Sequence, residues 1–433
     1  MIHSESRAAE TGVIVPEILL PAHSVDLFKW AVVACDQRTQ ERRFWGETAD
    51  IAGDAPSTLR LVFPEVYLED GGKDARIRKI HESMRGYLAG GVFAPAERGF
   101  LYIERETAGG LRQGLVVAVD LERYDWRPGA RPLIRASEGT IESRLPPRMA
   151  VRRAAPLELP HVMLLIDDEG DALFRGLAAG SGAFAYDTEL MQGGGRVRGR
   201  FVRDARHVAD TLAALARSSA ARYGCDEPFL FAVGDGNHSL ATAKAVWEEY
   251  KTEHEGDPGL MEGPLRYALV EVVNIYSAAL RFEPIHRVLL GASGDAIDIA
   301  SLTALFQTRS LRSRAELSSL VRQKVAHTRF GIIQGDCYIL AEASSPLLVT
   351  ALLDPLLEKF CAARSDTALD YIHGENELFA LCETRNAAGF LLPPFDKRGL
   401  FDTVAKTGPL PRKSFSMGEA QDKRYYLEAR PLR

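Results

Sequence analysis

The residues best suited to chemistry lie where a short apolar run meets a helical pattern. Phe229 to Val233 is apolar without alternation, which is typical of a strand buried on both faces. The next four residues, Gly-Asp-Gly-Asn, tolerate positive φ or cap a helix. From Ser239 onward, apolar residues recur at helical spacing. The stretch therefore predicts a strand, a tight turn and a helix, with Asp235 and His238 in the turn.

Two interpretations of this turn follow from the residue types. A carboxylate and an imidazole at a strand end, beside the free N–H groups of a helix, could move a proton and hold an anion. Alternatively, Asp235 and Asn237 only cap the turn, and His238 is an ordinary polar residue at a helix start. Spacing alone leaves both interpretations open.

The segment Asp235-Gly236-Asn237-His238-Ser239-Leu240 resembles the Asp-Gly-His-His-Arg-Tyr signature of the domain of unknown function 1015 family. More distantly, it is similar to the signature turn of the ParB/sulfiredoxin-like superfamily, which includes nucleotide-binding ParB proteins and a free-serine kinase. Asn237 stands where the family has its first histidine, and Ser239 stands where the family has arginine. The chain therefore lacks the cationic fork that the family has at this point.

A second group of candidates is rich in arginine, with five arginines between residues 135 and 153. Guanidinium groups bind phosphate or carboxylate in bidentate fashion, so Arg135, Arg144 and Arg148 could line an anion pocket. A solvated loop with surface ion pairs is the alternative. The Arg-x-x-Glu-x-Thr pattern of Arg135, Glu138 and Thr140 resembles another block of the same family. That resemblance favours a role in the site for Arg135, Glu138 and Arg144.

Near the start of the chain, Asp36 follows the apolar run from Trp30 to Cys35, which we predict to be a strand. Members of the family begin with a similar apolar run followed by Asp. Asp36 could face the same crevice as Asp235, or it could cap a helix predicted from Gln37 to Trp45.

Two later blocks also resemble the family. His286 and Arg287 follow a proline, as a His-Arg pair does in family members, and Lys413 and Ser414 resemble the family's C-terminal Pro-Gln-Lys-Ser block. By this resemblance, His286 would be a catalytic group, while Arg287, Lys413 and Ser414 would bind phosphate. The alternatives are a structural histidine and a C-terminal strand.

Composition narrows the classes of partner. Among 433 residues, 46% are hydrophobic and 26% charged, and the net charge is −6, so no basic character indicates nucleic acid or a membrane surface as a partner. No apolar run approaches the ~18 residues of a membrane span. The five cysteines are scattered and never spaced Cys-x-x-Cys, which argues against a disulfide framework or a zinc ribbon. We expect a cytoplasmic protein, and base rates favour a homodimer.

The pattern of runs and turns predicts a mixed α/β (α+β) fold, and the resemblance implies a ParB/sulfiredoxin-like strand–turn–helix core with additional α/β elaborations. We expect a flexible segment at residues 1–12, an α/β region at 13–150 and a larger α/β region at 151–433 that contains the turn. Because the matching blocks lie on both sides of the boundary, the two regions would share one crevice.

The candidate residues suit a small anionic or phosphorylated ligand, because cations would hold the anion while a carboxylate or imidazole moves a proton. The resemblance to a superfamily with a kinase favours a nucleotide-dependent phosphotransferase that uses ATP or ADP with Mg²⁺ on a small hydroxylated or amino-acid-like substrate. Asp235 would be the base or the metal anchor, and His238 would contact phosphate.

Two other functions stay open. A metal-dependent phosphoester hydrolase would need Asp235, His238, His286 and His373 to converge within coordination distance. A non-enzymatic ParB-like module for nucleotides or nucleic acid is the third hypothesis, and the acidic net charge weighs against it.

Overall fold

The computed structural model describes residues 10–180, 182–291, 299, 304–383 and 386–433, and it divides the chain into two compact units. The first unit is built from residues up to 281 together with 398–409 and 417–433, and the second from 282–397 and 410–416. The division expected near residue 150 falls inside the first unit instead. The reason is strand pairing, since strands from both sides of residue 150 lie next to each other in one sheet.

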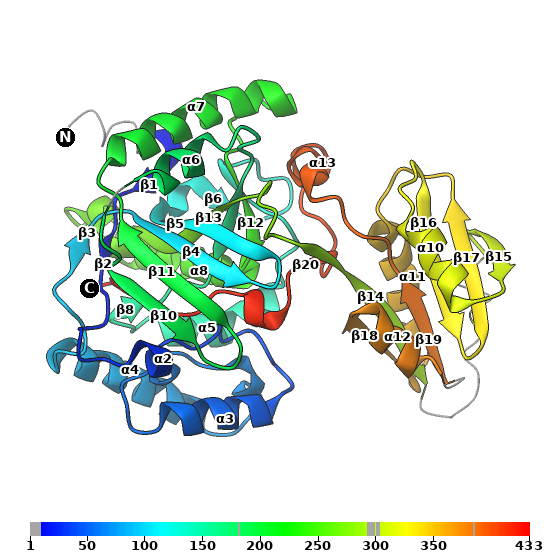
Figure 1. Cartoon of the computed structure of the whole chain (residues 1–433), viewed down its shortest axis with the longest axis horizontal. Helices are drawn as coiled ribbons and strands as arrows, with labels where there is room; N and C mark the ends of the chain where they lie inside the picture. The colour runs from blue at the N-terminus through cyan, green and yellow to red at the C-terminus, as the bar shows by residue number, and fades with distance from the viewer. Residues whose placement is uncertain (1–9, 181, 292–298, 300–303, 384–385) are drawn as a thin grey trace. The chain divides into compact units, whose positions relative to one another are not determined.

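The first unit contains a mixed ten-stranded sheet (Figure 1). In spatial order its strands are β10 (Tyr186–Leu190), β11 (Gly195–Phe201), β4 (Leu101–Thr107), β5 (Gly110–Asp120), β13 (Tyr267–Asn274), β9 (Met163–Ile166), β12 (Phe231–Asp235), β7 (Ile134–Ala136) and β6 (Tyr124–Asp125), with β1 (Val13–Ile14) paired to β5. From β10 along to β13, each strand runs antiparallel to the next one in this order. The parallel pairs are β13 with β9, β12 with β7 and β7 with β6. The predicted mixed α/β class is confirmed.

The helices of the first unit are α2 (Leu27–Trp30), α3 (Arg42–Ala52), α4 (Lys73–Ala89), α5 (Leu145–Arg152), α6 (Ala172–Ala178), α7 (Ala205–Tyr223), α8 (Asn237–Glu253) and α13 (Leu400–Thr407). Two short antiparallel pairs join β2 (Glu17–Ile18) to β3 (Glu97–Arg98) and β8 (Leu157–Glu158) to β21 (Arg430–Pro431). Residues of α7 and α8 belong to the same apolar core as the central strands.

The predicted strand, turn and helix are confirmed as β12 and α8. Gly236 links them with a φ of 80°, a left-handed conformation that a side chain would strain. A Cβ at this position would also lie 3.0 Å from Val162, the residue before β9. The turn is therefore tight because glycine allows both the backbone conformation and the close approach.

The strand predicted from Trp30 to Cys35 is wrong. Asp26 caps the short helix α2 by accepting from the N–H groups of Phe28 and Lys29, so Trp30 ends a helix. The residues that follow pair with the C-terminal segment, defined here as residues 419–433, through a bridge between Val33 and Tyr425. The predicted helix from Gln37 to Trp45 is displaced as well, because α3 begins at Arg42.

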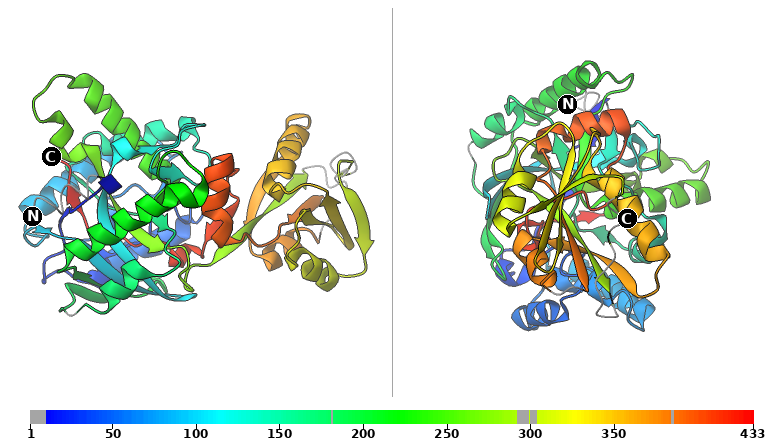
Figure 2. Two further views of the ribbon diagram at one scale, coloured as in Figure 1. Left: turned by 90° about the horizontal axis from the view of Figure 1, so that it is seen from above. Right: turned by 90° about the vertical axis from the view of Figure 1, so that its right-hand side faces the viewer.

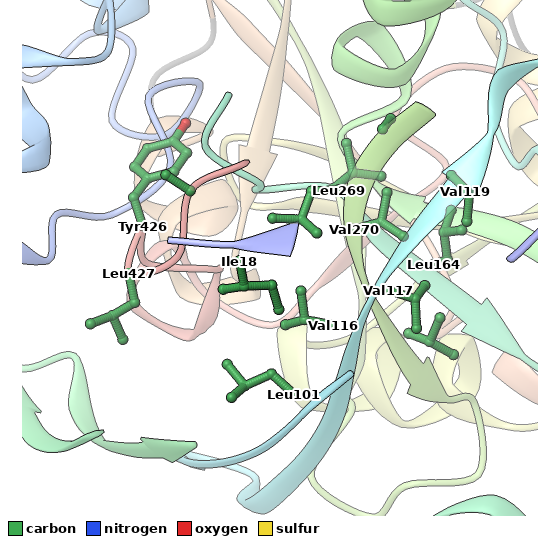
Figure 3. Close-up of a cluster of buried hydrophobic side chains, with 14 of the residues drawn as sticks. Ile18, Leu101, Val116, Val117, Val119, Leu164, Leu269, Val270, Tyr426 and Leu427 are labelled. Atoms are coloured by element: carbon green, nitrogen blue, oxygen red, sulfur yellow. The ribbon is translucent and has the colours of Figure 1, made fainter. Parts of the chain in front are cut away.

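The C-terminal segment is buried in the core of the first unit. Figure 3 shows Tyr426 and Leu427 beside Ile18, among the side chains of the central strands. The indole N–H of Trp30 donates to the carbonyl of Leu427 at 3.1 Å, and the backbone of Ala429 pairs with Leu19. Burial of these side chains removes a large apolar area from water and stabilises the segment in place.

A buried ion-pair network fixes this segment. The guanidinium group of Arg424 donates to Glu271 on β13 and to Glu428, and Glu428 also accepts from the hydroxyl group of Tyr186 at 2.5 Å. Burial by itself would raise the pKa of Glu271. The charges of Arg424 and Arg112 have the larger opposite effect and lower this pKa overall, so the carboxyl group stays ionised. Each buried charge therefore has an opposite charge beside it, as burial requires.

Replacing Arg424 with Met should strongly destabilise the first unit, because Glu271 and Glu428 would become buried charges without this partner. We expect a loss of about 3–5 kcal/mol in the free energy of unfolding, measured by urea titration. The control is Arg43→Met, which breaks the exposed pair with Glu47 and should change stability by less than about 1 kcal/mol. Equal effects of the two substitutions would contradict this role of Arg424.

The second unit has its own sheet. In spatial order its strands are β15 (Gln307–Leu311), β17 (Cys337–Ala343), β16 (Thr328–Gln334), β19 (Ala387–Leu391), β14 (Phe282–Gly291) and β18 (Thr367–His373), with β20 (Phe415–Met417) also paired to β14. Its helices are α10 (Arg314–Arg322), α11 (Val349–Ala362) and α12 (Glu375–Leu381).

Helices cover both faces of this second sheet (Figures 1 and 2). Leu289, Ile332 and Phe390 pack with α11 on one face. On the opposite face, Val288 and Ile333 are among the residues that pack with α10 and α12. Successive strand residues point to opposite faces, so neighbouring apolar residues such as Val288 and Leu289 on β14 and Ile332 and Ile333 on β16 supply both layers. Within the described part of the chain, no helix has the length and apolar character needed to span a bilayer.

Candidate functional site

The centre of the candidate site is Asp235, at the end of β12. Its Oδ1 atom accepts from the N–H of Gly236 at 3.0 Å, and its Oδ2 atom lies 3.3 Å from Nζ of Lys423. The side chain of Lys423 is only 7% exposed and comes from the C-terminal segment. The pair stands at the N-terminus of α8, where the first N–H groups of a helix attract anions. A carboxylate, an ammonium group and a helix N-terminus therefore meet at one turn.

Two polar atoms close to this turn have unmet hydrogen-bonding capacity. Nδ2 of Asn237 donates to Oγ of Ser137 at 3.3 Å. Oδ1 of Asn237 and Oγ1 of Thr140 are buried, and neither has a hydrogen-bond partner in the described part of the chain. A buried acceptor without a donor is costly, so a bound hydroxyl, amino or amide group would be stabilised here.

His238 holds the segment after β7 against α8. Its Nε2 atom accepts from the N–H of Ile141 at 3.3 Å, which requires an unprotonated Nε2. Glu138 lies half-buried in the same segment. In this arrangement His238 positions residues 137–141 over the turn.

A hydrogen-bonded chain runs beside the turn. Oγ of Ser239 lies 2.6 Å from Nε2 of His161, and Nδ1 of His161 lies 2.9 Å from the hydroxyl group of Tyr426. Burial raises the pKa of Tyr426 well above its ordinary value, so this hydroxyl group keeps its proton. Tyr426 also accepts from the N–H of Cys35, so its hydroxyl group links His161 to the backbone next to Asp36.

Asp36 belongs to the same group of side chains, because its Oδ2 atom lies 3.7 Å from Nε2 of His161. Burial would raise the pKa of Asp36, but His161, a hydrogen bond from Gln37 and the charge of Lys423 lower it overall. In contrast, burial and the charge of Asp36 raise the pKa of Glu65, although Glu65 is paired with Arg148. Neighbouring carboxyl groups whose pKa values are moved in opposite directions are typical of sites that move protons.

The predicted arginines are placed differently from one another. Arg148 forms an ion pair with Glu65, whose carboxyl group interacts with Asp36. Arg135 is buried with its guanidinium carbon 4.3 Å from the ring centroid of Phe229, and its Nε donates to the carbonyl of Pro132. Arg144 is exposed. Among the residues that the structure describes, neither Arg135 nor Arg144 forms a hydrogen bond or ion pair with Asp235 or Lys423, whereas Arg148 is linked to this group of side chains through Glu65.

The other predicted residues belong to the second unit. Arg287 is fully buried, donates to both carboxylate oxygens of Asp354 at 2.9 and 2.7 Å, and also donates to the carbonyl of Lys413. Nζ of Lys413 lies 4.1 Å from the ring centroid of Tyr371. Oγ of Ser414 donates to the carbonyl of Pro411 at 2.6 Å. These side chains form a group of their own inside the second unit.

His286, also in the second unit, is a buried neutral histidine. Its Nδ1 atom accepts from the N–H of Leu392 at 3.1 Å. Burial lowers its pKa from 6.5 to about 4. Among the described residues, no group of three or more His, Cys, Asp or Glu side chains is arranged to hold a metal ion.

The buried state of His286 predicts a pH dependence of stability. Between about pH 6.5 and pH 4 the unfolded chain binds a proton at this residue and the folded chain does not, so stability falls as the pH falls through this window. Lowering the pH from 7.5 to 5.0 should cost about 2 kcal/mol through this group, measured by urea unfolding at both values. His286→Gln should remove that part of the loss, while the exposed His23→Gln should keep it. An unchanged pH dependence in His286→Gln would contradict the prediction.

Sequence reasoning missed much of the group around the turn. Lys423 and Tyr426 come from the C-terminal segment, Ser137 follows β7, and Glu65 comes from a short 3₁₀ turn. His161 carried a weak signal, because it immediately precedes an apolar strand. The others have no sequence pattern that indicates a site.

The fold and this turn define a mixed α/β protein with a strand–turn–helix site at the end of a central strand. The family described as "Protein of unknown function (DUF1015)" matches residues 18–359, and the chain belongs to this family. The family resemblance of the Asp235–Leu240 segment is thereby confirmed. No curated protein matches the sequence significantly.

Three solved structures are distantly similar to the chain. A mutant free serine kinase in complex with AMP has a TM-score of 0.41 at 10% identity, covering 73% of this chain and 92% of that one. A conserved hypothetical protein from Pyrococcus furiosus has a TM-score of 0.36 at 10% identity, covering 72% and 90%. SbnI from Staphylococcus aureus, with a C-terminal truncation, has a TM-score of 0.37 at 12% identity, covering 73% and 87%.

Proposed function

We propose that this protein is a nucleotide-dependent phosphotransferase that acts on a small hydroxylated or amino-acid-like substrate. The observation that carries the proposal is the Asp235–Lys423 pair at the N-terminus of α8. The helix N-terminus and Lys423 together suit a phosphate group, and Asp235 is the adjacent base. The nucleotide part rests on the resemblance of the Asp235–Leu240 segment to the ParB/sulfiredoxin-like superfamily.

Each group at the turn has a role in such a transfer. Asp235 would take the proton from the substrate hydroxyl group as that oxygen attacks the terminal phosphorus of the nucleotide, and the nucleoside diphosphate would leave from ATP or the nucleoside monophosphate from ADP. Lys423 would offset the charge of the phosphoryl oxygens, since phosphoryl transfer depends mainly on positioning and electrostatic stabilisation. Oδ1 of Asn237 would accept from a hydroxyl or amino group of the substrate.

Magnesium would accompany the nucleotide. Mg²⁺ is usually held by one or two carboxylates together with phosphate oxygens and water. Asp36 is the carboxylate that would hold the metal here, because its lowered pKa keeps it ionised while Asp235 serves as the base. The metal would neutralise phosphate charge that Lys423 alone does not offset.

The proposal is tested by nucleotide binding and by transfer measured separately. We expect ATP or ADP with Mg²⁺ to bind the purified protein in calorimetry, and Lys423→Met to weaken binding at least about tenfold, because a charge-assisted contact to phosphate is lost. Asp235→Asn should keep most of the binding but abolish transfer of labelled phosphate to small hydroxylated amino acids, because an amide is not a base.

The matched control is Lys79→Met on α4, an exposed lysine that should leave both measurements unchanged. Circular dichroism would verify that each variant is folded. If the folded wild-type protein binds no nucleoside triphosphate or diphosphate at millimolar concentration, the proposal fails. If Lys423→Met binds nucleotide as tightly as the wild type, the nucleotide does not occupy this turn.

A further inference from the structure

The first unit contains a cavity of about 160 Å³ that borders the first turn of α8. Most of its wall is apolar, with Phe63 from the segment before α4, Met84 from α4, Val151 from α5, and Leu240 and Ala243 from α8. Such a wall cannot bind water well, because a buried water needs two to four polar partners. An apolar cavity of roughly 150 Å³ is large enough for a benzene-sized group.

One side of the same cavity is cationic. Arg152 lines it, and Nη1 of Arg152 lies 2.6 Å from Oε2 of Glu158. The Nε and Nη2 atoms of Arg152 are buried and have no hydrogen-bond partner among the residues that the structure describes. Buried donors without acceptors are costly, so an oxygen atom of a ligand would be strongly favoured at this point.

The charge around Arg152 is not balanced by Glu158. This carboxylate also accepts from Nε of Arg430 at 2.7 Å and from the N–H of Leu269 at 2.9 Å. Two guanidinium groups therefore share one carboxylate, which leaves a net positive charge beside an apolar cavity. Glu65 and Arg148, which also line the cavity, pair with each other and do not change this balance.

We propose that this cavity binds a small carboxylic acid with a phenyl or branched aliphatic body. The hydrocarbon body occupies the apolar part between α4, α5 and α8, and the carboxylate accepts from Nε and Nη2 of Arg152, whose planar fork matches a carboxylate. Asp235 and Lys423 do not line the cavity, whereas Ser239, His161 and Tyr426 of the hydrogen-bonded chain beside the turn do, so the two sites are neighbours. Binding of the acid does not depend on nucleotide binding.

The test is calorimetric titration of the full chain, without nucleotide, using 3-phenylpropionate and 4-methylpentanoate as probes and 3-phenylpropanol as the uncharged analogue. We expect saturable binding of both acids. Ala243→Leu and Ala155→Leu each place three more carbons in the wall of the cavity, and each should weaken acid binding at least about tenfold by filling it. Two filling variants are used so that one unfolded variant does not end the test.

Arg152→Met separates the role of the charge from that of the cavity. It should weaken binding of 3-phenylpropionate at least about tenfold and change binding of 3-phenylpropanol by less than about threefold. The neighbouring Arg153→Met is the matched control, because Arg153 is half-exposed, pairs with Glu249 and should leave both affinities unchanged. Failure of both acids to bind the folded wild-type protein, or unchanged affinity in the folded filling variants, would overturn the proposal. Equal weakening of acid and alcohol in Arg152→Met would overturn the carboxylate contact.

Discussion

The pairing of Arg424 with Glu271 and Glu428 is the interaction on which the first unit depends. All three side chains are almost completely buried, and a charge in that position is tolerated only beside an opposite charge with good hydrogen-bond geometry. Glu271 lies in β13 at the middle of the sheet, so the network ties the C-terminal segment to the central strands. The backbone pairing at Val33 and Tyr425 then follows from where this segment lies.

The candidate site contains residues that this ion-pair network holds in position. The residue before Arg424 is Lys423, which pairs with Asp235. Two residues after Arg424 lies Tyr426, whose hydroxyl group is hydrogen-bonded to His161. A chain terminus is free to fray unless it is tied down, so the burial of residues 419–433 is a condition for a defined site. Rigidity of the surrounding residues also keeps catalytic groups in a productive geometry.

Both units contain a buried arginine that is paired with one or two buried carboxylates. In the second unit, Arg287 is fully buried and makes a bidentate pair with Asp354, and it also donates to the carbonyl of Lys413, which holds residues 410–416 to that unit. In both units, therefore, a buried arginine fastens a late segment of the chain to strands or helices that lie earlier in the sequence. Arg287 and Lys413, which resembled phosphate ligands in sequence, are placed together by this structural contact.

The sequence by itself determined the local elements and the family. The apolar run of β12, the glycine that permits a φ of 80° and the helical spacing of α8 are local properties, so strand, turn and helix could be predicted from adjacent residues. The hairpin of β4 and β5 is equally local. The run from Trp30 to Cys35 was misassigned, because the cap at Asp26 and pairing with a segment almost 400 residues away outweigh its β propensity.

Only the tertiary structure decided which side chains meet. Lys423 reaches Asp235 across nearly 190 residues of sequence, and Tyr426 reaches His161 across 265, and no spacing rule relates positions so far apart. The same holds for the cavity, whose wall comes from α4, α5, α8 and the segment before α4. The periodicity of a sequence indicates on which face of an element a residue lies. Long-range contacts depend instead on the order of the strands in the sheet, and packing and the pairing of buried charges stabilise that order.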